Sequence, residues 1–222
     1  DSGELLSRGD TIFKGYYKNP EATEEALKGG WFHSGDAAII EEDGHIIIID
    51  RMSDVMKLVD GGKFSPQLIE NKLRFSPFIV DAVVIGKNRP FITAMIAIDM
   101  ANVGKWAENN QLAYTTFTDL SQKKEVYDII AVEVKKANET LPKVAKVNRF
   151  VLLYKELDAD DDELTRTRKV RRKFVEERYR DLIEGLYGDR EEIPVEADIR
   201  YKDGKGFRMK TTVWIKQVEK PD

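Results

Sequence analysis

Hydrophobic residues are spaced differently in three successive stretches of the chain. Residues 1 to 51 contain short alternating segments, typical of β-strands, separated by Gly, Asn-Pro and Asp-Gly turns. The segment "NPEATEEALKGG" predicts a brief helix, with Asn19 as its cap, Pro20 at its first position and the glycines at its end. A turn at Asp43 and Gly44 leads into residues 46 to 49, all isoleucine, which predict a buried strand.

Helix and strand patterns alternate between residues 52 and 187. Ser65 and Pro66 open a helix, and strands are predicted at "VDAVVIG", "FITAMIAID" and "NRFVLLYK". An amphipathic helix is predicted from about residue 122 to 141. A last helix is predicted from about residue 169 to 187, with an inward face made of Phe174, Val175, Tyr179, Leu182 and Leu186.

The remaining residues, 188 to 222, contain two alternating segments around residues 203 to 206, "DGKG". This pattern predicts a β-hairpin. The fold class is therefore α+β. The sequence leaves open whether the hairpin packs on the preceding region or mediates self-association, including a dimer through exposed strand edges.

Composition narrows the function classes. The 222 residues include 36 basic and 40 acidic side chains, for a net charge of −4, which gives the whole chain no attraction to nucleic acid or an anionic bilayer. Cysteine is absent, so a reducing cytoplasm is the simplest location, with peripheral contact at the inner membrane face left open. No apolar run approaches the roughly 20 residues of a membrane-spanning helix.

The chain begins without Met in strand-like sequence, so we expect a piece of a longer protein.

Several familiar chemistries do not fit the residues. Two histidines and no cysteine argue against a structural zinc site. His33, Ser34 and Asp36 are neighbours in sequence, which rarely form a catalytic triad. The segment "DGGKFS" lacks the spacing of a phosphate-binding Walker loop. The acidic run from Asp158 has neither the glycine nor the final glutamate of an EF-hand calcium loop.

Three motifs follow one another between residues 3 and 70: "GELLSRGDTIFKGYYKNPEATEEAL", "GWFHSGD" and "DRMSDVMKLVDGGKFSPQLIE". Together they resemble the carboxyl-terminal part of the AMP-forming acyl-CoA synthetases, in the adenylate-forming enzyme superfamily. The resemblance extends to about residue 187. Ser34 stands where the family usually has Thr.

A fourth motif, "ELTRTRKVRRKFVEERY", and the long segment around "KWAENNQLAYTTFTDLSQKKEV" are most similar to the long-chain fatty acid branch of this family. Arg166 replaces the usual Pro of the branch. Arg168 stands where many relatives have Gly, which bears on the flexibility of that loop. Neither departure changes which lysine matches the family's motif, namely Lys169.

The resemblance implies a reaction in two steps. A carboxylate attacks the α-phosphate of Mg-ATP to form an acyl-adenylate, and the thiol of CoA then displaces AMP. Asp36 matches the carboxylate that accepts hydrogen bonds from the ribose hydroxyls, and Arg51 matches the arginine that also holds the nucleotide. The Mg²⁺ ligands are expected outside this chain. The structural alternatives are a turn-capping aspartate and an exposed arginine at a strand end.

Lys169 matches the lysine that stabilises charge on the α-phosphate and the attacking carboxylate during adenylation. The alternative is a solvated basic cluster, made of Arg166, Arg168, Lys169, Arg171, Arg172 and Lys173. Such a cluster could also contact a nucleic-acid backbone. The acidic run before it and the absence of interleaved aromatic residues argue against that use.

The segment after Arg51 matches the family's moving parts. Ser53 occupies the hinge position, where Asp or Lys is customary, and a small residue can absorb a backbone rotation. After the rotation, Gly61 and Gly62 would line the pantetheine tunnel and Lys57 would face the site in place of Lys169. An ordinary turn before the helix at Ser65 explains the glycine pair equally well from local sequence.

The resemblance divides the chain into three parts: the β-rich end of a large adenylation domain at residues 1–51, a small mobile α/β domain at 52–187, and a hairpin extension at 188–222. It implies part of an ATP-dependent long-chain fatty acid CoA ligase, inactive without the N-terminal adenylation domain of the same enzyme. The alternatives are a ligase for a medium-chain or aryl acid and a non-enzymatic interaction module. The chain carries no acyl pocket that would choose among acids.

Overall fold

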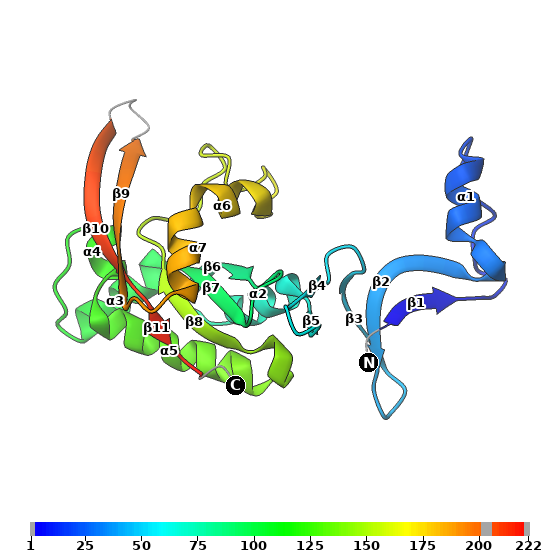
Figure 1. The fold of residues 1–222 in the computed structure, drawn as a ribbon, viewed down its shortest axis with the longest axis horizontal. Helices are drawn as coiled ribbons and strands as arrows, with labels where there is room; N and C mark the ends of the chain where they lie inside the picture. Colours follow the sequence, from blue (N-terminus) through cyan, green and yellow to red (C-terminus); the bar gives the residue numbers. More distant parts are fainter. Residues whose placement is uncertain (1–2, 201–205, 220–222) are drawn as a thin grey trace. The chain divides into compact units, whose positions relative to one another are not determined.

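The computed structural model describes residues 3 to 200 and 206 to 219. The chain divides into two compact units, Asp1–Met56 and Lys57–Asp222 (Figure 1). Each unit has its own sheet, so each is described by itself.

The first unit is a three-stranded antiparallel sheet with one short helix. Its strands are β1 (Gly3–Ser7), β2 (Phe32–Ile40) and β3 (Ile46–Arg51), in the order β1-β2-β3. Helix α1 (Pro20–Ala26) and a 3-10 turn (Lys28–Gly30) precede β2. The Asn19 side chain accepts a hydrogen bond from the Ala22 amide at 3.1 Å, and a proline opens the helix, which confirms the predicted cap.

The isoleucine strand is present, but the prediction that it is buried is wrong. Ile46, Ile47 and Ile48 are 53%, 44% and 58% exposed. Strand β3 is an edge strand of its sheet, and no other described element of the first unit covers these side chains. A β-branched run therefore predicted the strand correctly, whereas its burial depends on a covering layer that the unit does not contain.

The second unit is built on a four-stranded sheet in the order β11-β8-β7-β6. Its strands are β6 (Ile79–Ile85), β7 (Ile92–Ile98), β8 (Val147–Leu152) and β11 (Lys216–Gln217). Strands β7 and β8 run parallel and the other neighbours are antiparallel. The short strands β4 (Met56–Lys57) and β5 (Lys63–Phe64) pair with each other before helix α2.

Helices α2 (Pro66–Arg74) and α5 (Lys124–Glu139) contact this sheet and each other. As predicted, a helix opens at Ser65 and Pro66, and the Ser65 side chain caps it by accepting a hydrogen bond from the Leu68 amide at 3.0 Å. Helices α3 (Met100–Asn109) and α4 (Phe117–Ser121) and a 3-10 turn (Lys143–Ala145) were not predicted. No helix within residues 3–200 and 206–219 has both the length and the apolar character needed to cross a bilayer.

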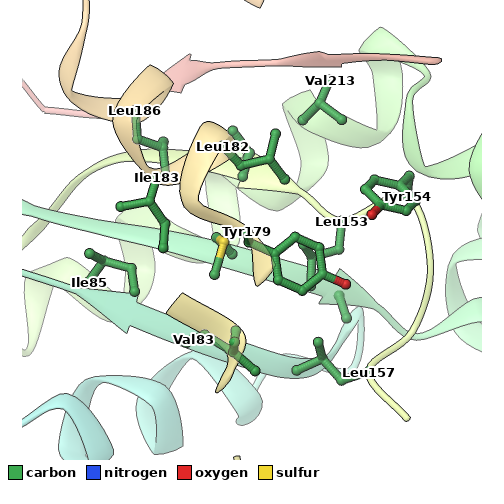
Figure 2. Close-up of a cluster of buried hydrophobic side chains, with 14 of the residues drawn as sticks. Val83, Ile85, Leu153, Tyr154, Leu157, Tyr179, Leu182, Ile183, Leu186 and Val213 are labelled. Carbon is green, nitrogen blue, oxygen red and sulfur yellow. The ribbon is translucent and has the colours of Figure 1, made fainter. Parts of the chain in front are cut away.

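A cluster of buried side chains joins the sheet to helices α6 (Arg172–Arg178) and α7 (Arg180–Tyr187). Val83 and Ile85 from β6 and Leu153 after β8 face Tyr179 and the apolar residues of α7 (Figure 2). Because alternate strand residues point to opposite faces, the remaining residues of β6 and β7 face α2 and α5.

The predicted single helix from 169 to 187 is wrong: it is two helices separated at Tyr179, and residues 169–171 belong to the preceding loop. Tyr179 has φ −100° and ψ 22°, outside the helical range. The backbone still bonds across the break, from the Ile183 amide to the Tyr179 carbonyl at 2.9 Å. The break coincides with a buried Tyr179 whose hydroxyl bonds Glu163, a tertiary contact that helical periodicity does not indicate.

The C-terminal segment belongs to the second unit and packs on the region before it, one of the two alternatives that the sequence left open. Strands β9 (Glu192–Arg200) and β10 (Gly206–Trp214) pair antiparallel, and the predicted turn between them lies largely outside the described residues. Ile193 and Val213 belong to the buried cluster, and β11 pairs with β8. The α+β fold class is confirmed.

Candidate functional site

Asp36 and Arg51 lie side by side in the first unit, because they are directly opposite each other in the β2–β3 ladder. The Arg51 Nη1 atom is 3.0 Å from the Asp36 Oδ1 atom and donates to the Ser34 carbonyl at 3.1 Å. The side chains are 64% exposed for Arg51 and 25% exposed for Asp36. A carboxylate and a guanidinium are thus presented together at the end of a strand pair, with Asp36 in a strand instead of capping a turn.

The residues before Asp36 shape this corner. Gly35 has φ +71°, a left-handed conformation that glycine adopts without steric cost. Its amide donates to Glu4 Oε1 at 3.1 Å, and the Asp36 amide donates to Ser34 Oγ at 3.1 Å. Glu4 Oε2 is also 3.0 Å from His33 Nδ1, and this hydrogen bond lowers the pKa of Glu4. The "HSGD" motif therefore ties β2 to β1 and fixes the direction of Asp36.

Ser53 lies in an exposed turn directly after β3. Its hydroxyl donates to Asp54 Oδ1 at 3.0 Å, and the Asp54 and Val55 amides both bond the Arg51 carbonyl. The boundary between the two compact units falls after Met56.

Lys57, Gly61 and Gly62 form one turn at the start of the second unit. The Leu58 amide donates to the Gly62 carbonyl at 2.8 Å, and the Gly61 amide donates to the Leu58 carbonyl at 3.1 Å. Gly61 has φ +90°, so a side chain there is strained although the space beside it is open. A Cβ at Gly62 would lie 2.4 Å from Val144 Cγ2, so this glycine allows close packing. The two glycines are needed for different reasons.

Lys169 lies in a short closed loop between β8 and α6. An isolated bridge joins Leu164 to Val170. Inside it, the Thr165 amide donates to the Lys169 carbonyl at 2.8 Å, and the Lys169 amide donates to Thr165 Oγ1 at 3.0 Å. The Lys169 side chain is exposed, and its ammonium group has no partner among the residues that the structure describes. The loop backbone is held while the amine is free.

A buried carboxylate supports the base of this loop. Glu163 is fully buried and accepts hydrogen bonds from Lys155 Nζ at 2.8 Å, the Tyr179 hydroxyl at 2.7 Å and the Asp158 amide at 3.1 Å. Its carbonyl accepts from the Arg171 amide at 2.8 Å. Burial, reinforced by the negative charge of Glu163, raises the pKa of Tyr179, so the phenol stays a donor.

Two further buried carboxylates hold the cations beside Lys169. Arg172 Nη2 is 2.6 Å from Glu70 Oε1 on α2, and Arg168 Nη2 is 3.0 Å from Asp81 Oδ2 on β6. Sequence reasoning did not identify Glu70, Asp81 or Glu163. The available signal was a charged residue inside an apolar strand, "IVDAVVI", which requires a partner when buried.

The structure therefore brings Asp36 and Arg51 together, and places Lys57, Gly61 and Gly62 in one turn. Lys169 lies on a different loop of the second unit. Among the described residues, no group of three or more His, Asp or Glu side chains is arranged to hold a metal ion.

Comparison with known proteins identifies the family. Residues 53–191 match the model described as AMP-binding enzyme C-terminal domain. Over 188 residues the chain is 37% identical to the long-chain-fatty-acid–CoA ligase FadD15 of Mycobacterium tuberculosis, covering 84% of this chain and 31% of that protein. Long chain acyl-CoA synthetase 1 of Arabidopsis thaliana is 33% identical over 190 residues, covering 84% and 28%. The chain thus spans about a third of the length of these relatives.

The fold agrees with this match. The adenylation domain of a carboxylate reductase from Mycobacterium chelonae aligns with a TM-score of 0.59 at 23% identity, covering 85% of this chain and 28% of that one. The resemblance to the carboxyl-terminal part of adenylate-forming enzymes, expected from the motifs, is confirmed. The chain belongs to the family of AMP-binding enzyme C-terminal domains.

Proposed function

We propose that the chain is the C-terminal part of an ATP-dependent ligase that joins long-chain fatty acids to CoA through an acyl-adenylate. The observation that carries this proposal is the Lys169 loop, whose backbone is fixed by hydrogen bonds while its amine is free. The relatives named as long-chain fatty acid ligases support the substrate class.

Lys169 is proposed as the catalytic cation of adenylation. Negative charge grows on the α-phosphate and the incoming carboxylate in the transition state, so a cation placed there stabilises that state more than the bound substrates. An exposed, unpaired ammonium group can make such a contact without first breaking an internal ion pair.

Asp36 and Arg51 are proposed to hold the ribose of ATP and AMP. The donor set fits this ligand, because a carboxylate accepts from two neighbouring hydroxyl groups while a guanidinium donates to ribose or phosphate oxygens. The existing ion pair would orient both groups before the nucleotide binds. The Mg²⁺ that accompanies ATP is proposed to be held by groups outside this chain.

The second step is proposed to use the turn near the unit boundary. A rotation about Ser53 would exchange Lys169 for the Gly61–Gly62 turn, with Lys57 facing the same site. The open space beside Gly61 suits a backbone surface that approaches a narrow thiol-bearing chain. The N-terminal adenylation domain of the same enzyme is the proposed partner, and residues 1–51 its last β segment.

The test is Lys169→Ala in the full-length ligase, assayed for each half-reaction. Pyrophosphate release should fall by about two to three powers of ten, the scale of removing one charge-stabilising group. Thioester formation from supplied acyl-adenylate should be nearly unchanged. Arg166→Ala, which removes an unpaired cation from the same loop, is the matched control.

Equal loss of both half-reactions would contradict the role of Lys169. A panel of long-chain, medium-chain and aryl acids in the pyrophosphate assay tests the substrate class separately. Preference for an aryl acid would overturn the long-chain assignment and leave the adenylation chemistry intact.

A further inference from the structure

We propose that Asp81 and Arg168 are positioning residues, which hold the loop carrying Lys169 against strand β6. This inference rests on the proposed function only for its effect on activity. The anchoring itself can be measured on the chain alone.

The contact joins two segments far apart in sequence. Arg168 Nη2 donates to Asp81 Oδ2 at 3.0 Å, and the Asp81 side chain is only 5% exposed. Arg74 approaches the other oxygen at 4.0 Å, beyond hydrogen-bond distance. Among the described residues, Arg168 is therefore the cation that hydrogen-bonds Asp81, the third residue of β6.

The backbone of Arg168 has an unusual conformation at the residue that makes this contact. Arg168 has φ +58°, a left-handed conformation that is uncommon for a residue with a side chain. Only glycine adopts this conformation free of steric cost. Arg168 adopts it with a full side chain, and in the proposal the bond to Asp81 helps to offset that cost.

Lys169 is the next residue in the chain, so an anchor at Arg168 fixes its backbone within one peptide unit. The Arg168 amide also bonds the Thr165 carbonyl at 2.9 Å, across the loop. Glu163 holds the base of the loop and Asp81 holds its tip. The Lys169 backbone is thus preorganised, and only the side chain is left to reach the reacting phosphate.

The first experiment measures hydrogen exchange by mass spectrometry in peptides covering residues 164–170 of this chain. Asp81→Asn and Arg168→Gln should each speed exchange by about 10-fold or more, the scale of one charge-assisted hydrogen bond. The double variant should add little to either single one, because both remove the same contact. Arg166→Gln is the matched control and should leave exchange unchanged.

Arg168 is largely exposed, so Arg168→Gln keeps the test valid if Asp81→Asn disturbs the folded sheet. Unchanged exchange in Arg168→Gln would overturn the anchor. Additive effects of the two substitutions would overturn it as well, because they would show that the residues act separately.

The second experiment measures the two half-reactions of the full-length ligase. Arg168→Gln should slow acyl-adenylate formation by roughly 10-fold, while thioester formation from supplied acyl-adenylate stays within twofold. Arg168→Lys, which keeps the charge, should recover part of the loss. Faster loop exchange with normal adenylation would overturn the positioning role. If Lys169→Ala were also without effect, the proposed function would fail, and the exchange data would still decide the anchor.

Discussion

Removing Arg172 should destabilise the second unit through the buried carboxylate that it serves. Glu70 is 7% exposed and accepts hydrogen bonds from Arg172 Nη2 at 2.6 Å and from the Val84 amide at 2.9 Å. Arg172 also donates to the Val84 carbonyl at 2.7 Å. This one guanidinium joins the first turn of α6 to α2 and β6, directly after the Lys169 loop. Arg172→Met keeps much of the apolar stem and removes the charge.

The size of the effect follows from the burial of Glu70. Deleting one partner of a buried ion pair costs about 3–5 kcal/mol, because the remaining charge loses its compensation. The Arg172 side chain is 23% exposed, so water reaches the vacated space and the lower end applies. We expect a loss of about 3 kcal/mol in the free energy of unfolding. In a unit of this size the melting temperature should fall by about 6–12 °C.

The loss should depend on pH in a defined direction. Burial raises the pKa of Glu70 above its ordinary 4.5, although Arg172 acts to lower it. The folded state therefore holds the Glu70 proton more tightly than the unfolded state does. The free energy of unfolding falls as the pH rises from the ordinary pKa of Glu70 through its raised folded-state pKa. Without Arg172 the pKa should rise further. Arg172→Met should then be most destabilising at neutral pH, and the loss should shrink as the pH falls towards 4.5.

Urea unfolding at pH 7.5 and pH 5 measures this difference. A Trp31→Phe background removes the tryptophan of the first unit, so that Trp106 and Trp214 report on the second. Adding Glu70→Gln to Arg172→Met is the control, because the amide oxygen can still accept from the Val84 amide without a charge. The double variant should be more stable than Arg172→Met at pH 7.5 and less sensitive to pH. An equal loss from Arg172→Met at both pH values would refute the reasoning.

Two further substitutions test packing in the second unit by urea unfolding. Gly62→Ala should cost about 1–3 kcal/mol, because the new Cβ meets Val144 Cγ2, and Val144→Ala in the same chain should restore part of the loss. No recovery would show that the clash is not the cause. Asn138→Ala should cost about 2–4 kcal/mol, because fully buried Asn138 bonds both the amide and the carbonyl of Val147. A loss under about 0.5 kcal/mol would contradict that accounting.

Local sequence predicted the elements whose signals are local. The caps at Asn19 and Ser65 and the apolar strands β6 and β7 were confirmed because side chain and backbone interact within a few residues. The break at Tyr179 was missed because the apolar periodicity continues through it, and the contact of Tyr179 with Glu163, 16 residues away, is not a local signal. Helix α3 was also missed, although Asp99 caps it by accepting from the Asn102 amide at 2.9 Å.

The candidate site was predictable to a similar extent. The motif match selected Asp36 and Arg51 separately, and only the structure shows that they face each other in the β2–β3 ladder and form an ion pair. It could not indicate that Asp81 would hold Arg168, because residues 87 positions apart meet only through the sheet and the loop above it. Motifs select the groups that contact a ligand, whereas the carboxylates that fix those groups depend on tertiary packing. Their roles in the reaction stay predictions.

The basic cluster after the acidic run separates into two kinds of cation. Arg168, Arg171 and Arg172 pair with Asp81, Asp162 and Glu70, respectively. Arg166, Lys169 and Lys173 have no such pair among the described residues. A phosphate-backbone interface needs most of its cations free, and half of this cluster would first have to give up internal partners, two of them buried.

Apart from the unpaired Arg166, the division into paired and unpaired cations also follows the difference between arginine and lysine side chains. A guanidinium can bond a carboxylate and a carbonyl at once, as Arg172 does with Glu70 and Val84, so arginine suits a fixed anchor. An ammonium group on a flexible stem is a point charge that can move to a developing anion, which suits a transferable catalytic cation. Lys169 is held at its backbone by its neighbours and left free at its amine. That combination is what the proposed catalytic role of Lys169 requires, and the half-reaction assay of Lys169→Ala decides between that role and a solvated surface cation.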